Sequence, residues 1–277
     1  MGTPVARPRA LGVAGLSNAR DLGGLPAADG SRVARHRVYR AELLVYSGQD
    51  SIHSSWEQTN AGDLASLGVR TVLDLRSAHE AAATPSAWQE ATGATDARSF
   101  PIDDGGLGAA RDYVDMLLTR RLASFGERHL GEHYSAVLED RAETLGAAVS
   151  VVADGGPVLI HCTEGKDRTG LLVAVILGAL GAPSEAIVED YALSGAWRPD
   201  RALAYSPHFE EAGVPLASYR GLYESPPEAM RMALEGVLER YGSMSSYLTE
   251  RAGVGDHVLA RLREALLEPD VPQTGPR

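Results

Sequence analysis

The residues best suited to chemistry lie in one stretch, His161-Cys162-Thr163-Glu164-Gly165-Lys166-Asp167-Arg168-Thr169-Gly170. It contains the only cysteine and the only lysine of the 277-residue chain. A cysteine is a nucleophile as its thiolate, which a nearby cation and a helix N-terminus favour. Arg168 offers a planar, permanently charged group that matches two oxygens of a phosphate. Together they indicate nucleophilic phosphoryl transfer, in which an enzyme mainly positions groups and stabilises charge.

The sequence on either side predicts how this stretch is held. The apolar run 157–160 predicts a buried strand, and residues 171–180 predict a buried helix that ends at Gly181. In a strand–loop–helix turn the loop amides converge on the helix N-terminus, where unpaired N–H groups and the helix dipole attract an anion. We therefore expect a loop that binds the substrate through Thr163, Glu164, Gly165, Lys166, Thr169 and Gly170.

Two other interpretations of these motifs were weighed. A free cysteine is more often a buried, inert residue, but here the histidine, glycines, arginine and threonine all stand at the offsets that the chemistry needs. Separately, His129-Leu130-Gly131-Glu132-His133 matches a zinc-protease pattern. A glycine inside the helix and the lack of a matching third ligand favour a solvated helix face, so we expect no metal site.

Composition limits the classes of function. The chain has 44% hydrophobic and 23% charged residues, which is typical of a soluble globular protein, and its net charge is −11. That charge argues against nucleic-acid binding and against docking on an anionic membrane. No run approaches the roughly 20 apolar residues of a membrane span, and residues 1–9 do not form a signal peptide. We expect a cytoplasmic protein. The sequence leaves open both the oligomeric state and export by a route that needs no signal peptide.

The periodicity predicts an α/β fold with a central, mostly parallel sheet flanked by helices. We expect strands at 38–41, 69–76 and 100–102, a β-hairpin turn at 25–30, and helices at 61–67 and 228–241. For residues 112–152 we expect helix, interrupted near Gly126 and Gly146. We expect Ser184 to cap a further helix and residues 195–225 to form an irregular segment. We expect one domain over residues 11–268, with helical lid elements within 105–150 and 195–250 and flexible termini at 1–10 and 269–277.

Several motifs in order carry a family resemblance. They are Asn18-x-Arg20-Asp21-Leu22-Gly23-Gly24, Tyr39-Arg40-Ala41, the 68–76 strand followed by Glu80, the Gly165–Gly170 loop, Asp190-Tyr191-x-Leu193-Ser194, and the ending around Tyr241 and Tyr247. The chain resembles the bacterial atypical tyrosine/lipid phosphatases, the group of mycobacterial phosphatase B, within the protein tyrosine phosphatase superfamily. The resemblance extends from about residue 11 to 268.

The resemblance implies an enzyme that hydrolyses phosphotyrosine, and in some members phosphoserine, phosphothreonine or phosphoinositides, without a cofactor. It implies that Cys162 is the nucleophile, that Arg168 clamps the phosphate, and that Asp167 takes part in acid/base steps. Asp103, which follows Phe100-Pro101, is our choice for the acid that protonates the leaving oxygen, with Asp104 as the alternative. Lys166 adds a second cation. Glu164 departs from the alanine usual in relatives, and a carboxylate there either opposes a polyanionic substrate or pairs with Lys166.

Other functions use similar residues. A phosphatase acting on a nucleotide or another small phosphorylated metabolite would keep the same loop. A non-catalytic phosphate-binding module usually loses one of Cys162, Arg168 and Thr169, and all three are present here. Sulfur transfer also uses a loop cysteine, but Lys166 and Thr169-Gly170 favour phosphate. The expected partner is thus a phosphorylated protein or a small phosphomonoester.

Overall fold

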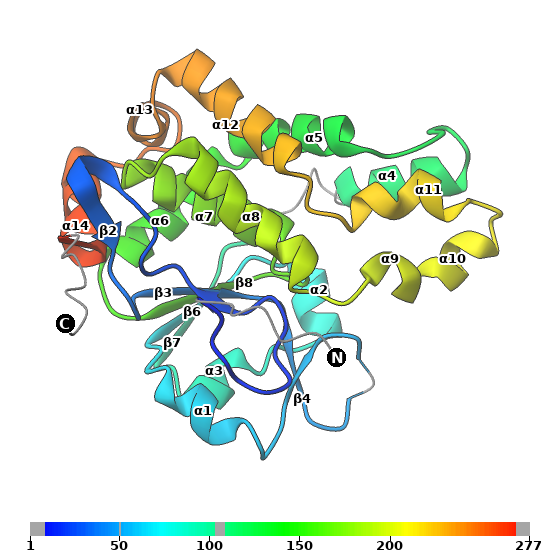
Figure 1. The fold of residues 1–277 in the computed structure, drawn as a ribbon, viewed down its shortest axis with the longest axis horizontal. Coiled ribbons are helices and arrows are strands. Elements are labelled where there is room, and N and C mark those ends of the chain that lie inside the picture. The colour runs from blue at the N-terminus through cyan, green and yellow to red at the C-terminus, as the bar shows by residue number, and fades with distance from the viewer. Residues whose placement is uncertain (1–8, 50, 103–108, 270–277) are drawn as a thin grey trace, which may run out of the picture.

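The structure is a computed structural model that describes residues 9–49, 51–102 and 109–269 (Figure 1). Its centre is a five-stranded sheet in the order β1-β3-β8-β6-β7. Only β1 runs antiparallel to its neighbour, so the prediction of a mostly parallel sheet is confirmed. The strands are β1 (Arg20–Asp21), β3 (Val38–Ala41), β6 (Thr71–Asp74), β7 (Asp96–Ser99) and β8 (Val158–His161).

Both faces of this sheet are buried. Alternate side chains of a strand point to opposite sides, so each strand contributes to the hydrophobic cluster on either face. In β8, Val158 and Ile160 belong to the larger hydrophobic cluster and Leu159 belongs to a second one. In β6, Leu73 and Val72 divide in the same way. This two-sided burial explains why the strands have nearly continuous apolar sequences.

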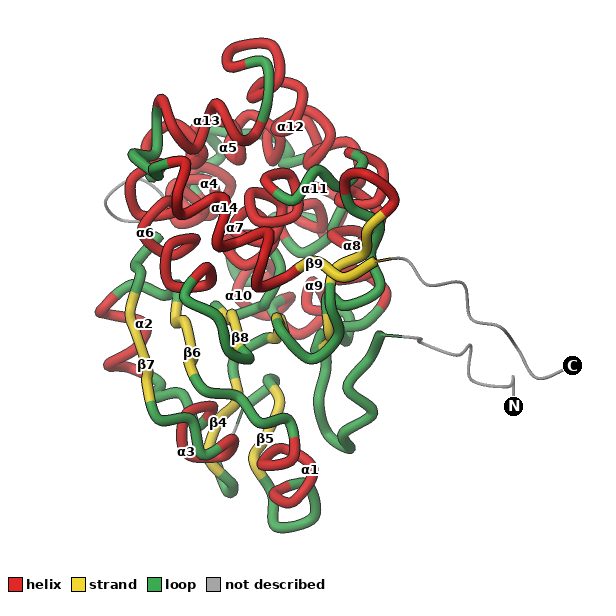
Figure 2. The backbone as a smooth tube through the Cα atoms, turned by 90° about the vertical axis from the view of Figure 1, so that its left-hand side faces the viewer, coloured by secondary structure: helices red, strands yellow, loops and turns green. Residues whose placement is uncertain are grey.

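Helices cover the two faces (Figures 1 and 2). In Figure 1, α1 (Ala61–Ser66) and α3 (Trp88–Thr92) lie below the sheet, with α2 (Ala78–Ala83) at its end. The longer helices lie above it and form the larger cluster with it. They are α5 (Glu127–Asp140), α6 (Ala142–Ala153), α7 (Asp167–Ala179), α8 (Ser184–Ala196), α12 (Pro227–Tyr241), α13 (Met244–Glu250) and α14 (Asp256–Leu266).

A third group of helices lies beyond the carboxyl end of β8. It comprises α4 (Ala109–Leu118), α9 (Arg201–Ala204), α10 (Ser206–Glu210), α11 (Leu216–Tyr219) and the 3-10 helix η2 (Arg220–Leu222). α4 and α11 lie side by side although about a hundred residues separate them (Figure 1). The segment 195–225, expected to be irregular, is therefore a chain of short helices. No helix within the described ranges has the length and apolarity needed to cross a bilayer.

One local strand prediction is wrong. Phe100–Ile102 follows β7 but is not a strand: Phe100 and Ile102 donate to Asp74 and Leu75, while Pro101 between them has no N–H to donate. The expected hairpin turn is confirmed, and its tip is the 3-10 helix η1 (Ala28–Gly30). Ala27 and Val33 donate across it to the carbonyl oxygens of Ser31 and Leu25, and Pro26 forms an antiparallel bridge with Arg32. The strand after the turn, β2 (Ser31–Val33), also pairs with β9 (Leu267–Pro269), which the sequence did not predict.

The predicted limits of ordered structure also need correction. Pro269 lies in β9 rather than in a flexible terminus, because it pairs with Ser31. Arg9 is held by an ion pair with Asp190, and Ala10 bridges to Arg20, so these residues belong to the fold. A further small sheet, β4 (Leu44–Tyr46) with β5 (Ser54–Trp56), had no sequence signal that we recognised.

Two predicted helix signals were misread. Gly146 lies inside α6 and does not interrupt it; the break falls at Arg141, between α5 and α6. A Cβ atom at Gly146 would lie 2.4 Å from the carbonyl oxygen of Ala252, so the glycine permits close packing. Ser184 is the first residue of α8, whose N-cap is Pro183, and it makes no capping hydrogen bond.

Gly146→Ala is therefore expected to lower the free energy of unfolding by about 1–3 kcal/mol, because the added methyl group must displace backbone. Denaturant unfolding measures this. Gly62→Ala in α1 is the matched control: a Cβ there meets nothing within 4 Å, so alanine should be neutral or stabilise by up to about 1 kcal/mol. Equal effects of the two substitutions would contradict the packing role.

Candidate active site

The loop between β8 and α7 has its carbonyl groups fixed from outside. The side-chain amide of Asn18 donates to the carbonyl oxygens of Glu164 and Gly165, both at 3.0 Å. Arg40 donates to the Gly165 carbonyl as well, at 2.8 Å. The loop carbonyls are therefore turned away from the loop's centre.

This arrangement leaves the loop N–H groups for a ligand. A peptide N–H points opposite to the carbonyl of the same peptide unit, so the N–H groups of Gly165 and Lys166 face inward. Within the part of the chain that the structure describes, no N–H of residues 163–166 has an acceptor. α7 begins directly after them, at Asp167. The predicted strand–loop–helix turn is therefore present, and its cradle of N–H groups suits an anion at a helix N-terminus.

Two glycines make the loop's shape possible. Gly165 has a φ of +60°, and a Cβ there would lie 2.3 Å from the carbonyl oxygen of Ala41. A Cβ at Gly170 would lie 3.1 Å from the ring of Tyr191. Gly165 thus lets the loop pack closely against the end of β3, and Gly170 lets α7 approach α8.

A buried ion cluster holds the residues that hold the loop. Asp190 on α8 pairs with Arg20 at 3.1 Å, with Arg40 at 2.7 Å and with Arg9 at 2.6 Å. Burial alone would raise the pKa of Asp190, but these arginines hold it well below its usual range. Burial and the neighbouring Arg40 lower the pKa of Arg20 to about 9. Asn18 accepts from Arg20 at 2.6 Å, which orients its amide toward the loop.

Cys162 is buried, with 2% of its surface exposed, and it borders a cavity of about 190 Å³. The polar lining comes mostly from the loop and its neighbours: Cys162, Glu164, Lys166, Asp167, Arg168 and Arg198. The apolar lining comes from α4, from the start of α5 with the residue before its N-cap, and from the η2 region: Tyr113, Val114, Phe125, Leu130, Leu222 and Tyr223. A hollow of about 490 Å³ borders Glu80 and Thr163 but not Cys162, so it is not the place of the thiol chemistry.

Arg168 is oriented by Glu80 of α2. Its two terminal nitrogens donate to the two carboxylate oxygens at 2.6 and 2.7 Å. Glu80 also accepts from the Ser77 backbone in a capping box and from the Thr163 hydroxyl at 2.8 Å. Burial would raise the pKa of Glu80, but Arg168 brings it far below its usual range. A bidentate pair of this kind fixes the plane of the guanidinium beside the loop.

Asp167 is held as a carboxylate. Burial would raise its pKa, but Lys166 at 3.2 Å and the hydroxyl of Tyr134 lower it below the usual value. Tyr134 also hydrogen-bonds Tyr191 at 2.8 Å, and its own pKa is raised by burial and by Asp167. An ionised Asp167 in the free protein suits a base or an electrostatic anchor better than a proton donor.

Lys166 does not stand free beside the phosphate cradle. Its side chain is 1% exposed, and the ammonium donates to the carbonyl oxygens of Leu222 and Glu224, both at 2.8 Å. Burial is the main reason that its pKa is lowered. The second cation therefore links the loop to the residues after η2.

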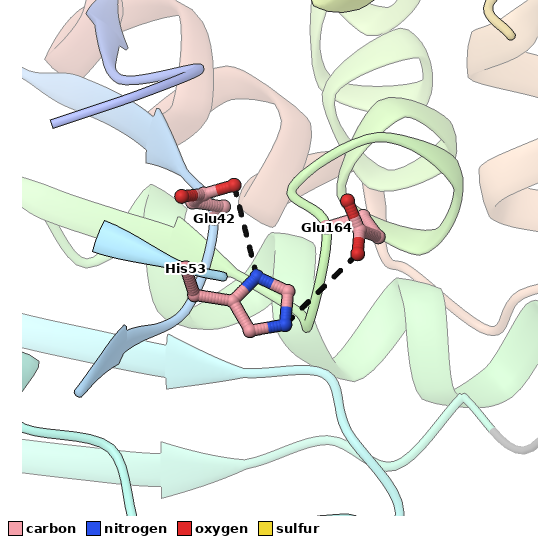
Figure 3. A group of neighbouring side chains, drawn as sticks. All are labelled: Glu42, His53 and Glu164. Atoms are coloured by element: carbon pink, nitrogen blue, oxygen red, sulfur yellow. Dashed lines mark ion pairs between the residues drawn. The ribbon is translucent and has the colours of Figure 1, made fainter. Parts of the chain in front are cut away.

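Glu164 pairs with two arginines rather than with Lys166. Its Oε2 lies 2.6 Å from Arg198 and 3.1 Å from Arg201. Together with Glu42 and His53 it forms the one group of three metal-type ligands found among the described residues (Figure 3). His53 lies 3.8 Å from Glu42 and 4.0 Å from Glu164.

This group does not fit a metal ion. Arg201 also donates to Glu42 at 2.6 Å, so one guanidinium already bonds both carboxylates and would repel a cation. The cluster is a charge-balanced link between the loop, the residues after β3 and α9. The zinc-like pattern at residues 129–133 forms no cluster in the described part of the chain either. Glu132 pairs with Arg128 at the surface, and His133 borders the cavity beside Cys162, which we call the reaction cavity.

The two threonines of the loop differ in their roles. Thr163 donates to Glu80 and so contributes to the orientation of Arg168. Thr169 is fully buried, and its hydroxyl has no hydrogen-bond partner within residues 9–49, 51–102 and 109–269. Its hydroxyl is therefore available to a ligand, and its contact with a phosphate or with the thiolate stays a prediction.

Several residues of the site were not found from the sequence. Glu80 was noted only as part of the resemblance, and its capping position on α2 was the available signal. Tyr134, Arg198 and Arg201 had no signal, because they reach the loop from distant elements. Asp103 and Asp104 lie outside the described residues.

Comparison with known proteins decides the family. The tyrosine phosphatase family model matches residues 11–268. The chain belongs to the tyrosine phosphatase family. It is thus an enzyme of the phosphoric monoester hydrolase class.

Three curated bacterial proteins are similar to this tyrosine phosphatase family member. A protein named as a tyrosine-protein phosphatase in Cupriavidus necator is 28% identical over 85% of this chain and 81% of its own length. The tyrosine-protein phosphatase of Nostoc commune is 29% identical over 73% of this chain and 68% of its own. The triple specificity protein phosphatase PtpB of Mycobacterium tuberculosis is 32% identical over 43% of this chain and 47% of its own.

Asp190→Asn is expected to lower the free energy of unfolding by about 3–5 kcal/mol, because buried Arg20 and Arg40 lose their counter-charge. The pKa of Asp190 is lowered in the folded state, so its contribution is present above the unfolded value of about 3.9 and is lost as the pH falls. The stability of the native protein should therefore decrease more steeply below about pH 4 than that of the variant.

Denaturant unfolding at neutral pH and at several acidic pH values checks both points. Asp154→Asn removes an exposed pair with Arg261 and should cost less than about 1 kcal/mol. The cluster's role is refuted if Asp190→Asn costs no more than this control.

Proposed function

We propose that the protein hydrolyses phosphomonoesters through a cysteinyl-phosphate intermediate and that aryl phosphates such as phosphotyrosine are its preferred substrates. The observation that carries the proposal is the position of Cys162 in a cavity lined by two chemically different sets of groups. One set contains Arg168 and lies with the inward N–H groups of the loop, which together fit a phosphate dianion. The other set consists of aromatic and aliphatic side chains, which fit a ring.

In the first step, the Cys162 thiolate attacks phosphorus and the bond from phosphorus to the ester oxygen breaks. Arg168, kept in its plane by Glu80, and the loop amides hold the three equatorial oxygens. We assign Asp103 as the acid that protonates the departing oxygen. An acid with a proton to donate is needed here, and Asp167 is held ionised.

In the second step, water attacks the phosphorus of cysteinyl-phosphate and the sulfur–phosphorus bond breaks, which restores the thiolate and releases phosphate. The water loses a proton as it attacks. An ionised Asp167 beside the loop suits the role of the accepting base, with Tyr134 and Lys166 holding its carboxylate. The Thr169 hydroxyl, buried near the loop, is available to stabilise the thiolate as it leaves.

The preference for aryl phosphates follows from the shape and lining of the cavity. Tyr113 and Phe125 meet edge to face, with ring centres 4.7 Å apart, on one part of the wall. Tyr223 lines the cavity and stacks on Tyr205 at 5.0 Å. Burying a substrate ring against these side chains is favourable, whereas a serine or threonine phosphate leaves much of the wall uncovered.

Cys162→Ser is expected to reduce hydrolysis of a generic aryl phosphate by at least about 10³-fold, because a hydroxyl is far less ionised than a thiol at neutral pH. The assay contains a metal chelator, since no metal takes part in the proposed steps. Rapid acid quench of the native enzyme followed by mass spectrometry should show a phosphoryl group on Cys162. Equal rates in the native and Cys162→Ser proteins would refute the thiol mechanism.

Asp103→Asn is expected to slow substrates with poor leaving groups by about 10²–10⁴-fold and to affect a nitrophenyl phosphate much less, because only poor leaving groups need a proton. A plot of log kcat against leaving-group pKa measures this. Asp104→Asn serves as the matched neighbour and should leave the slope unchanged. If Asp104→Asn or Asp167→Asn steepens the plot instead, the proton comes from that residue.

A further inference from the structure

The segment that carries Leu222 and Tyr223 is fastened through its backbone. The carbonyl oxygens of Leu222, Tyr223 and Glu224 all accept hydrogen bonds from cations that line the reaction cavity. Lys166 bonds the first and third, and Arg198 bonds the second at 2.6 Å. Leu222 and Tyr223 form part of the apolar cavity wall, so these bonds determine where that wall stands.

Arg198 is buried and has a fixed partner in three directions. Its Nε donates to the carbonyl oxygen of Ser194 at 2.9 Å, one turn earlier in the chain. One terminal nitrogen donates to Tyr223, and the other to Glu164 at 2.6 Å. A buried guanidinium needs a counter-charge, and the carboxylate paired with it is that of Glu164.

Glu164 is itself held in place by a second arginine. Arg201 on α9 donates to the same Oε2 at 3.1 Å and to Glu42 at 2.6 Å. The Glu164 carboxylate therefore has a defined position between α8, α9 and the residues that follow β3. It transmits that position through Arg198 to the Tyr223 backbone.

We propose that Glu164 is a positioning residue that sets the preference for aryl phosphates, by fixing through Arg198 the cavity wall formed by Leu222 and Tyr223. The inference rests on the phosphatase function proposed above and adds the residue that controls substrate choice. Glu164 acts on the ring-binding wall and not on the phosphate cradle, whose bonds come from Asn18, Arg40 and Glu80.

The wall is sensitive to such a change because Tyr223 is packed on several sides. Its ring stacks on Tyr205 and meets Tyr219 edge to face at 6.4 Å. When a substitution at Glu164 removes the carboxylate, the Arg198 guanidinium will hydrogen-bond other acceptors or water. The Tyr223 carbonyl then loses a fixed donor. The wall is then held by Lys166 alone, and its freer Tyr223 pays an ordering cost when a ring binds, so affinity for the ring decreases.

Two probes separate the wall from the cradle. Inorganic phosphate reports the cradle alone, and phenylphosphonate, which is not hydrolysed, reports the cradle and the wall together. Calorimetric titration of Glu164→Ala should give a phosphate Kd within about twofold of the native value and a phenylphosphonate Kd raised by about 10-fold. In turnover of an aryl phosphate, KM should rise by a similar factor while kcat changes little.

The conservative variant and a coupling test make the experiment specific. Glu164→Gln keeps an acceptor for Arg198 and should recover part of the lost phenylphosphonate affinity. Arg198→Lys cannot reach all three partners and should match Glu164→Ala. The double variant Glu164→Ala/Arg198→Lys should be no weaker than either single one, because the two residues act in series. Glu185→Gln, which removes an exposed pair with Arg231, is the control and should change neither Kd.

Three outcomes overturn the proposal. Phosphate and phenylphosphonate affinities could fall together, which would place Glu164 in the cradle. Both could stay at the native values in folded Glu164→Gln and Arg198→Lys. The effects of the two residues could add in the double variant. A native protein that binds both probes but forms no cysteinyl-phosphate would refute the proposed reaction, while the two Kd values would still decide the role of Glu164.

Discussion

A single buried carboxylate, Asp190, supports the rest of the site. It lies on α8 and bonds Arg9, Arg20 and Arg40, so the N-terminal segment, the sheet and one covering helix meet at one group. Three guanidinium groups on one carboxylate leave an excess of buried positive charge. One of these guanidinium groups, that of Arg40, also faces the loop and donates to the carbonyl oxygen of Gly165. The same cluster that joins the elements therefore also turns the loop amides toward a phosphate.

The cations near Cys162 have separate tasks, which their partners define. Glu80 fixes the orientation of the Arg168 guanidinium beside the cradle, where it is suited to phosphate oxygens. Lys166 and Arg198 bond backbone carbonyls of residues 222–224 instead. Of these three cations in a chain with a net charge of −11, two thus bond the segment that forms part of the cavity wall.

The sequence predicted the parts of the fold that have a local cause. The loop, the strand before it and the helix after it were found because apolar runs and spacing belong to contiguous residues. The predictions failed where a distant partner decides the outcome. β2 pairs with β9 from the other end of the chain, and Gly146 is needed because Ala252 packs against α6. Single-sequence patterns contain no information about such partners, since the partner is chosen by packing.

For function, the sequence by itself determined the family, and it predicted the nucleophile and the phosphate-binding arginine, because ten contiguous residues between a strand and a helix suffice to form an anion cradle. Only the tertiary structure decided what orients these groups. Glu80 lies 88 residues before Arg168, Tyr134 lies 33 before Asp167, and Arg198 lies 34 after Glu164. These pairs form when separate helices pack around one sheet. Hydrogen bonds then stabilise the charged forms of the groups that the packing has brought together.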